Sequence, residues 1–154
     1  MDEDAIPWLT DAEQALWRRW MRLNAALPAA LHRDLQADGL SLPDFEVLVQ
    51  LTDRPDHRLR TSELARALHW ERSRVSHHVT RMLKRGLVLR EECPDDGRGA
   101  YVVLTDAGRA AIHTAAPGHV RAVRRLVFDA LSPEDIAAVD AVFERVLARV
   151  DPIP

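Results

Sequence analysis

The chain has 154 residues, of which 47% are hydrophobic and 29% charged, the balance of one globular domain rather than of a disordered chain. No apolar run reaches the roughly 18 residues of a membrane span, and the acidic segment 1–4 lacks the basic opening of a secretory signal. The single cysteine, Cys93, excludes an intrachain disulfide framework. We therefore expect a protein of the reducing cytoplasm.

The net charge of −3 is unevenly distributed along the chain. Residues 1–53 carry −6, residues 54–109 carry +4 and residues 110–154 carry −1. A basic centre between less basic ends is typical of a local nucleic-acid site. Ordinary surface variation gives the same pattern, so charge alone leaves both interpretations open.

Helix start and stop signals dominate the N-terminal third. Thr10 and Glu13 have the spacing of a capping box, which predicts a helix from residue 11 to the high thirties, ended by Gly39. Pro28 lies inside this helix and is expected to kink or interrupt it, because proline lacks the amide hydrogen and clashes with the preceding turn. The capped segment 41–52 predicts a second helix.

Two more helices are expected in the basic centre, followed by a change to alternating polarity. Thr61 or Ser62 is expected to cap a short helix that ends near His69, and a further helix is expected over about 71–85. Two short strands are then predicted, at 87–91 and 100–104, joined by the turn-rich segment 93–99. This pattern predicts a β-hairpin with an exposed, charged tip.

The C-terminal third predicts two helices. The first is capped by Thr105 and runs over about 106–131, with an expected interruption near Pro117. Ser132 and Pro133 open the second, since one is a preferred N-cap and the other a preferred first residue. Apolar residues follow helical spacing along it, namely Ile136, Val139, Phe143, Val146, Leu147 and Val150.

The predicted fold class is therefore mainly α with a small β-hairpin wing (α+β). We expect one compact unit in which residues 43–105 form a winged helix-turn-helix. Residues 1–42 and 106–154 contribute the flanking N- and C-terminal helices. Their apolar stripes pack either on the module or on a second copy of the chain.

A helical wheel of residues 72–85 separates two faces. Val75, Val79, Met82 and Leu83 predict a buried stripe. The opposite face is basic and polar, which suits the major groove of double-stranded DNA. The N-terminal part of such a helix usually meets the bases, so we assign Ser73, Arg74 and His77 to bases and Thr80, Arg81 and Lys84 to phosphates. A solvated basic surface is the alternative for this helix taken alone.

The elements on either side of this helix favour DNA binding. Thr61 and Ser62, at the start of the short helix, can present amides and hydroxyls to a phosphate. Arg98 near the hairpin tip can enter a narrow minor groove, and Asp96 can hold its guanidinium or the loop in place. An exposed charge pair of little energetic weight is the alternative for Asp96 and Arg98.

In this order, the motifs resemble the MarR (multiple antibiotic resistance regulator) family of bacterial transcription factors over about residues 10–150. The most specific segment is 95–108, whose Asp-x-Arg, strand and Leu-Thr-x-x-Gly pattern is similar to the family's wing signature. Each of the other segments is weak alone, and together they are specific. They are residues 42–48, 62–65, 73–76, 79–82 and 85–88.

The resemblance implies a homodimer joined by the N- and C-terminal helices, with two recognition helices and two wings on a palindromic operator. It also implies repression, and release of DNA on binding small, often phenolic or lipophilic, effectors. Some family members sense oxidants through a cysteine in the first helix. Cys93 lies instead at the end of the first predicted wing strand, which argues against that mechanism.

The resemblance further places an effector pocket between the dimer helices and the DNA module. The candidate lining residues are Trp17, Trp20, His32, Phe45 and Trp70. Aromatic residues at helical spacing more often fill a core, so simple packing is the alternative.

The sequence favours no metal site, no cofactor and no enzyme. The adjacent His77 and His78 point about 100° apart on a helix, and no Cys/His cluster has zinc spacing. A catalytic nucleophile, base and orienting residue cannot be assembled from the spacing. The rival function is a winged-helix module that binds protein without specific DNA binding, which predicts a more apolar recognition face.

Overall fold

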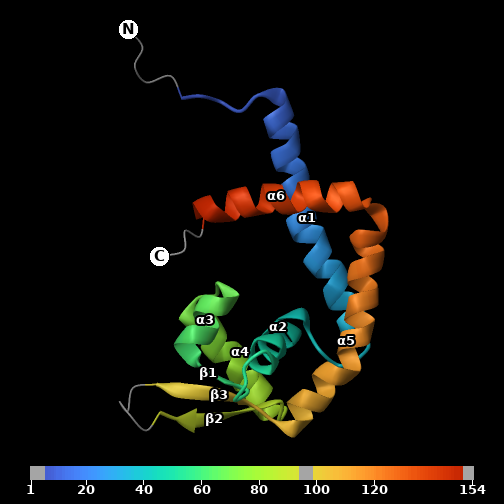
Figure 1. The fold of residues 1–154 in the computed structure, drawn as a ribbon. Coiled ribbons are helices and arrows are strands. Elements are labelled where there is room, and N and C mark those ends of the chain that lie inside the picture. Colours follow the sequence, from blue (N-terminus) through green and yellow to red (C-terminus); the bar gives the residue numbers. More distant parts are fainter. Residues whose placement is uncertain (1–5, 94–98, 151–154) are drawn as a thin grey trace.

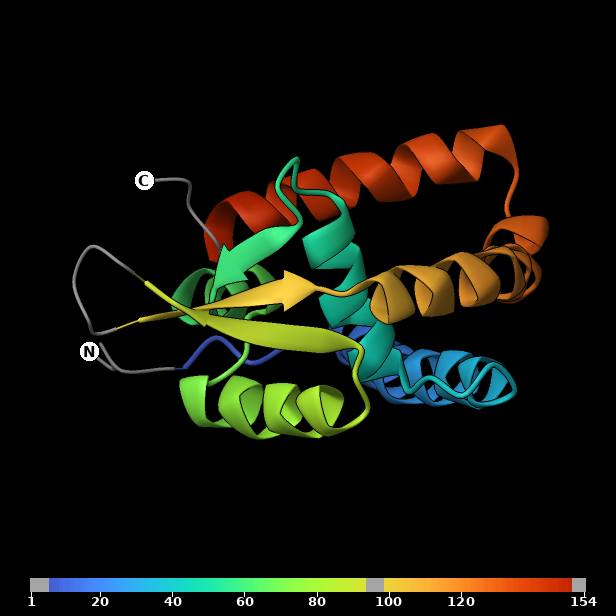
Figure 2. The ribbon, with the colours of Figure 1, turned by 90° about the horizontal axis from the view of Figure 1, so that it is seen from below.

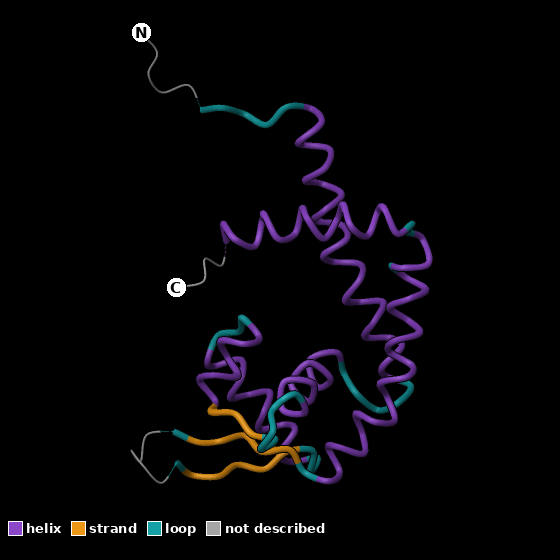
Figure 3. The backbone as a smooth tube through the Cα atoms, viewed as in Figure 1, coloured by secondary structure: helices purple, strands orange, loops and turns teal. Residues whose placement is uncertain are grey.

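The computed structural model of the chain describes residues 6–93 and 99–150. Its helices are α1 (Asp11–Gln36), α2 (Leu42–Thr52), α3 (Thr61–Leu68), α4 (Arg72–Lys84), α5 (Asp106–Leu126) and α6 (Pro133–Val150), with a 3-10 turn at Phe128–Ala130. The strands β1 (Arg58–Arg60), β2 (Val88–Glu92) and β3 (Ala100–Leu104) form one antiparallel sheet in the order β1-β3-β2. This mainly helical fold with a small sheet (Figure 3) confirms the predicted class.

Four helices, α1, α2, α5 and α6, begin where the sequence places their caps. Thr10 and Glu13 form a reciprocal capping box at α1, and Ser132 and Asp135 form the same arrangement at α6. Each box satisfies amide groups that the first helical turn leaves unpaired. Thr105 caps α5 by accepting a hydrogen bond from the Gly108 amide at 3.0 Å.

Neither internal proline interrupts its helix. α1 continues through Pro28, and α5 continues through Pro117 as far as Leu126, so the predicted interruption near Pro117 is wrong. The C-terminal half of α1 packs against α5 (Figure 1). This packing offsets the lost backbone hydrogen bond and the steric clash, which cost about 3 kcal/mol in an isolated helix.

The strand β1 was not predicted. It has three residues, of which only Leu59 is buried, and it pairs with β3 so that Arg58 faces Val103 and Arg60 faces Tyr101. Two arginines around a single leucine carry too little alternation to mark a strand. Pairing with β3 therefore decides the conformation of this segment.

One continuous apolar core joins α2, α3, α4 and the sheet. Leu48, Leu51, Leu64, Val79 and Val102 are fully buried in it. Figure 1 shows this winged module at the bottom of the molecule, with α5 rising from it and α6 lying across the upper part of α1. No residue of α6 is buried, so α6 adds nothing to the core of a single chain.

A buried carboxylate ties the corner between α1 and α2 to α4. The Asp44 side chain accepts a hydrogen bond from the Ser41 amide at 2.9 Å. Its other partners are His78 Nε2 at 3.0 Å and Arg85 Nη1 at 2.7 Å, and Arg85 also donates to the Gly39 carbonyl. Burial alone would raise the pKa of Asp44, but the hydrogen bonds from His78, Ser41 and Arg85 outweigh burial and hold that pKa well below its usual value.

We expect Asp44→Asn to lower the free energy of unfolding by roughly 2–3 kcal/mol near neutral pH, somewhat less than for a fully buried pair because Arg85 is half-exposed. The low folded-state pKa stabilises the protein fully above about pH 5, and this contribution is lost as the pH falls through the acid range. The variant lacks the contribution, so its stability should decline less between about pH 6 and pH 3. Urea unfolding at fixed protein concentration measures both effects.

The matched control is Asp53→Asn, which removes an exposed carboxylate at the end of the same helix. It should leave both the stability and its pH dependence close to those of the parent chain. An Asp44→Asn variant that follows the parent's pH dependence would show that this carboxylate does not couple folding to protons.

Gly108 lets the first turn of α5 lie directly against the chain that enters β2. A Cβ atom at this position would overlap the backbone carbonyl oxygen of Leu87, and backbone cannot swing aside. Gly108→Ala should therefore destabilise the fold by about 1–3 kcal/mol. Gly118→Ala in the same helix meets only ordinary contacts, 3.4 Å from Asp38 Oδ2, and should be neutral or stabilising by up to about 1 kcal/mol. Thermal unfolding of both variants checks this, and equal melting temperatures would contradict it.

Candidate nucleic-acid interface

The two faces of α4 lie as predicted. Val75, Val79 and Met82 are fully buried, and Leu83 packs against the same core. The side chains assigned to DNA are all exposed, namely Ser73, Arg74, His77, Thr80, Arg81 and Lys84. Figure 2, seen from below, shows α4 beside the β2–β3 hairpin on the same face of the molecule. The fold thus presents a polar, basic helix face next to a wing.

Two of the basic side chains on α4 are oriented by partners. The Arg74 guanidinium lies 4.0 Å from the centre of the Trp70 ring, a cation–π arrangement. Arg81 Nη2 lies 2.8 Å from His78 Nδ1. Because a guanidinium only donates, Nδ1 accepts and the ring proton of His78 lies on Nε2, toward Asp44. A buried carboxylate therefore orients an exposed arginine through one imidazole.

This role of His78 was missed by the sequence analysis, which considered the residue only as a metal ligand. His78 is 5% exposed, and the Trp70 ring meets it edge-on with the ring centres 5.6 Å apart. On the helical wheel His78 adjoins the apolar stripe beside Val75 and Val79. That position was the available signal, because a histidine on a buried face needs polar partners.

The start of α3 differs from its prediction. Arg60, not Thr61 or Ser62, is the N-cap residue, because β1 runs directly into α3. The Thr61 hydroxyl donates to the Ala100 carbonyl of β3 at 3.0 Å. Its proton is therefore not free to donate to a phosphate. Ser62 is exposed, and its assignment to a phosphate stays a prediction.

The wing carries basic groups that the sequence analysis did not single out. Arg58 and Arg60 lie over the Tyr101 ring, with the guanidinium carbons 4.7 and 5.6 Å from its centre. Arg58 also pairs with Asp56 at 2.9 Å and, more loosely, with Glu91 at 3.6 Å. No sequence signal was strong enough to place these arginines, because a single leucine between two arginines does not mark a strand.

The predicted wing-tip contacts, Asp96 and Arg98, lie outside the described residues. At the described end of the hairpin, the Cys93 amide donates to the Gly99 carbonyl at 3.1 Å and extends the pairing of β2 with β3. The Cys93 side chain is buried, and Gly99 packs close to its sulfur.

The five residues proposed for an effector pocket do not meet at one place in the chain. Phe45 lines a pocket of about 480 Å³ between α1, α2, α3 and α5. His32 lines a smaller one of about 270 Å³, and its Nδ1 accepts from the Leu42 amide at 3.2 Å. Trp70 packs on α4, whereas Trp17 is exposed.

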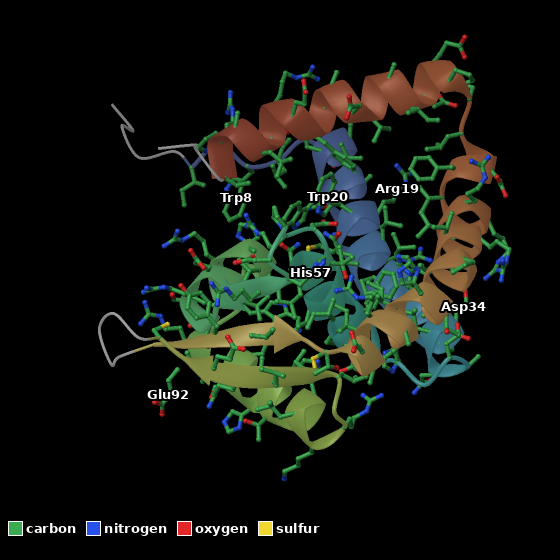
Figure 4. The ribbon with its side chains drawn as sticks, turned by 60° about the horizontal axis from the view of Figure 1, so that its bottom comes forward. Trp8, Arg19, Trp20, Asp34, His57 and Glu92 are labelled. Carbon is green, nitrogen blue, oxygen red and sulfur yellow. The ribbon has the colours of Figure 1, made fainter. Side chains whose placement is uncertain are left out.

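Trp20, the fifth of these residues, marks where α6 meets α1. Its ring packs edge-on against Phe143 with the centres 5.5 Å apart, and Figure 4 shows it projecting from α1 beside α6. In the described part of the chain the apolar face of α6 remains exposed, with side chains 39–70% exposed. They are Ile136, Val139, Val142, Phe143, Val146, Leu147 and Val150.

The described part of the chain offers neither a cluster of metal ligands nor a membrane-spanning helix. Within residues 6–93 and 99–150, no three His, Cys, Asp or Glu side chains gather in an arrangement that could hold a metal ion. No helix in these ranges combines the length and the apolar character needed to cross a bilayer.

Comparison with known proteins identifies the family. The model of the MarR family matches residues 40–99. AbsC, a MarR family transcriptional regulator from Streptomyces coelicolor, is 41% identical, with a TM-score of 0.88 over 94% of this chain and 98% of AbsC. Sco3205, a MarR family regulator from the same organism solved in complex with DNA, is 41% identical, with a TM-score of 0.91 over 97% of this chain and 94% of that chain.

A more distant relative is the transcriptional repressor MprA of Escherichia coli K12. It is 26% identical over 139 residues, which are 90% of this chain and 78% of MprA. The family model covers the winged module up to the start of β3, and the identity to AbsC and Sco3205 extends over nearly their whole lengths. The chain therefore belongs to the MarR family of transcriptional regulators.

Proposed function

We propose that the protein is a homodimeric repressor that binds a palindromic operator in double-stranded DNA and is released by a small-molecule effector. The observation that carries the DNA part is the exposed polar and basic face of α4 beside the wing, opposite a fully buried stripe. Sco3205, at 41% identity, was solved in complex with DNA, and MprA is named a transcriptional repressor. Both support the proposal.

The three parts of the chain take separate roles in this proposal. Residues 43–105 bind DNA, and residues 1–42 and 106–154 join two copies. Action on DNA places the protein in the cytoplasm, and the proposal includes no catalytic role, metal or cofactor. A winged-helix module that binds protein is disfavoured, because the recognition face is charged rather than apolar.

The position of each side chain along α4 decides whether it is proposed to contact a base or a phosphate. Ser73, Arg74 and His77, in its N-terminal half, face the bases in the major groove, where arginine reads guanine. Thr80, Arg81 and Lys84 lie further along and hold phosphates, as does Ser62 at the start of α3. Asp96 and Arg98 remain predicted contacts of the wing. Two copies related by a twofold axis place the half-sites about one helical turn apart.

Selection from a random pool of duplexes with the purified full chain tests the DNA assignment. We expect a palindromic winner that binds at least about a thousandfold more tightly than its scrambled sequence. On this duplex, Arg74→Ala should lose roughly 1–3 kcal/mol of discrimination at one base pair of each half-site. Lys84→Ala should instead weaken all sequences alike and flatten the salt dependence.

Two results would contradict these assignments. Equal losses on the selected and scrambled duplexes for both variants would remove Arg74 from base reading. An absence of enrichment, with binding that only follows salt concentration, would leave a generic basic surface. The protein-binding alternative would then take precedence.

The uncovered face of α6 gives a test of the dimer. Val139 and Val146 lie on this face and are each about 40% exposed, so glutamates at both positions should place charges in an apolar interface. Val139→Glu with Val146→Glu should raise the dimer dissociation constant at least about tenfold in sedimentation equilibrium. Ala148→Glu, on the opposite side of α6, is the control and should not change it. A dimer unaffected by both valine changes would place the interface elsewhere.

A further inference from the structure

The larger pocket has the size and the lining of a small-molecule site. It is an open hollow of about 480 Å³ where α1, α2, α3 and α5 meet, and its volume is within the range of ordinary ligand sites. Leu27 and Leu31 of α1, Phe45 and Val49 of α2 and Leu68 of α3 make most of its wall apolar. Such a wall fits an apolar body of one or two rings.

One carboxylate dominates the electrostatics of this pocket. Among the described lining residues, Glu46 alone carries a formal charge, and no arginine or lysine is present. His119 is the other titratable group, and burial lowers its pKa, which keeps its ring neutral near neutral pH. The Phe45 ring lies 4.3 Å from that imidazole. The pocket is therefore apolar with a single negative group.

Glu46 is half-buried and makes no hydrogen bond or ion pair with any other described residue. Burial raises its pKa, while Arg74 and His78 lower it from a distance. Both of those side chains are engaged elsewhere, because Arg74 lies over the Trp70 ring and His78 faces Asp44. A half-buried carboxylate without a partner is costly, and a donor from outside the chain would relieve that cost.

We propose that this pocket binds a small amphiphilic cation, whose ring body packs against Phe45 and Leu68 while a protonated amine donates to Glu46. The proposal deepens the effector part of the proposed function and rests on it. A charge-assisted hydrogen bond supplies affinity, and like-charge repulsion from the half-buried Glu46 disfavours carboxylate ligands of the same shape. The site thus selects its effector by the sign of its charge.

Three probes of matched shape test this selection: naphthylmethylamine, naphthylmethanol and naphthoate. Calorimetric titration of the full chain at neutral pH, without DNA, should show the amine binding at least about tenfold more tightly than the alcohol. Naphthoate should bind most weakly. Glu46→Gln should reduce the affinity of the amine to that of the alcohol, whereas Asp53→Asn, which removes a carboxylate of α2 outside the pocket, should preserve the ranking.

Equal binding of the amine and the alcohol, or tightest binding of naphthoate, would overturn the charge selection. Failure of all three probes would overturn the site and indicate that a second copy of the chain covers it. If Glu46→Gln does not fold, the ranking on the parent chain still decides. These titrations contain no DNA and the duplex selection contains no probe, so failure of the pocket and failure of DNA binding are distinguishable.

Discussion

The buried carboxylate of Asp44 is the constraint on which the recognition surface depends. It holds the corner between α1 and α2 through Ser41, and it holds α4 through His78 and Arg85. Charge inside a fold is costly unless every lone pair finds a donor, so this cluster specifies one relative placement of α2 and α4. Because His78 also accepts from Arg81, the same cluster orients a side chain that the proposal places on DNA. Stability and recognition thus share one hydrogen-bonded group.

The rest of the interface follows from how the sheet is assembled. β1 pairs with β3 and brings Arg58 and Arg60 to the base of the wing. α3 starts directly from β1, which moves its cap to Arg60 and commits the Thr61 hydroxyl to β3. These shifts are small along the sequence, yet they change which groups remain free for phosphates. Arg74 is preoriented by Trp70, which reduces the entropy lost when an arginine binds a base.

A single chain leaves two features incomplete. Within the described residues the apolar face of α6 stays exposed although Phe143 touches Trp20, and contiguous exposed apolar surface of this kind marks an interaction site. Glu46 lies in the wall of an apolar pocket and pairs with no other described residue. The exposed face of α6 suits contact with a second copy of the chain, and Glu46 suits contact with a ligand. The pocket lies where the flanking helices α1 and α5 meet the winged module, so under the proposed function its occupancy can influence where the two recognition helices sit.

Patterns among near neighbours were enough to predict the helices, every cap but that of α3, the hairpin and the exposed face of α4, because a cap or a 3.6-residue period is complete within a few residues. The sequence therefore determined the fold class and most candidate DNA contacts. Only the tertiary structure decided the continuity of α5 through Pro117, the existence of β1, and the separation of Trp17, Trp20, His32, Phe45 and Trp70. Asp44 and Arg85 are 41 residues apart. The role of His78 depends on this contact, and no local pattern encodes a pairing between distant segments.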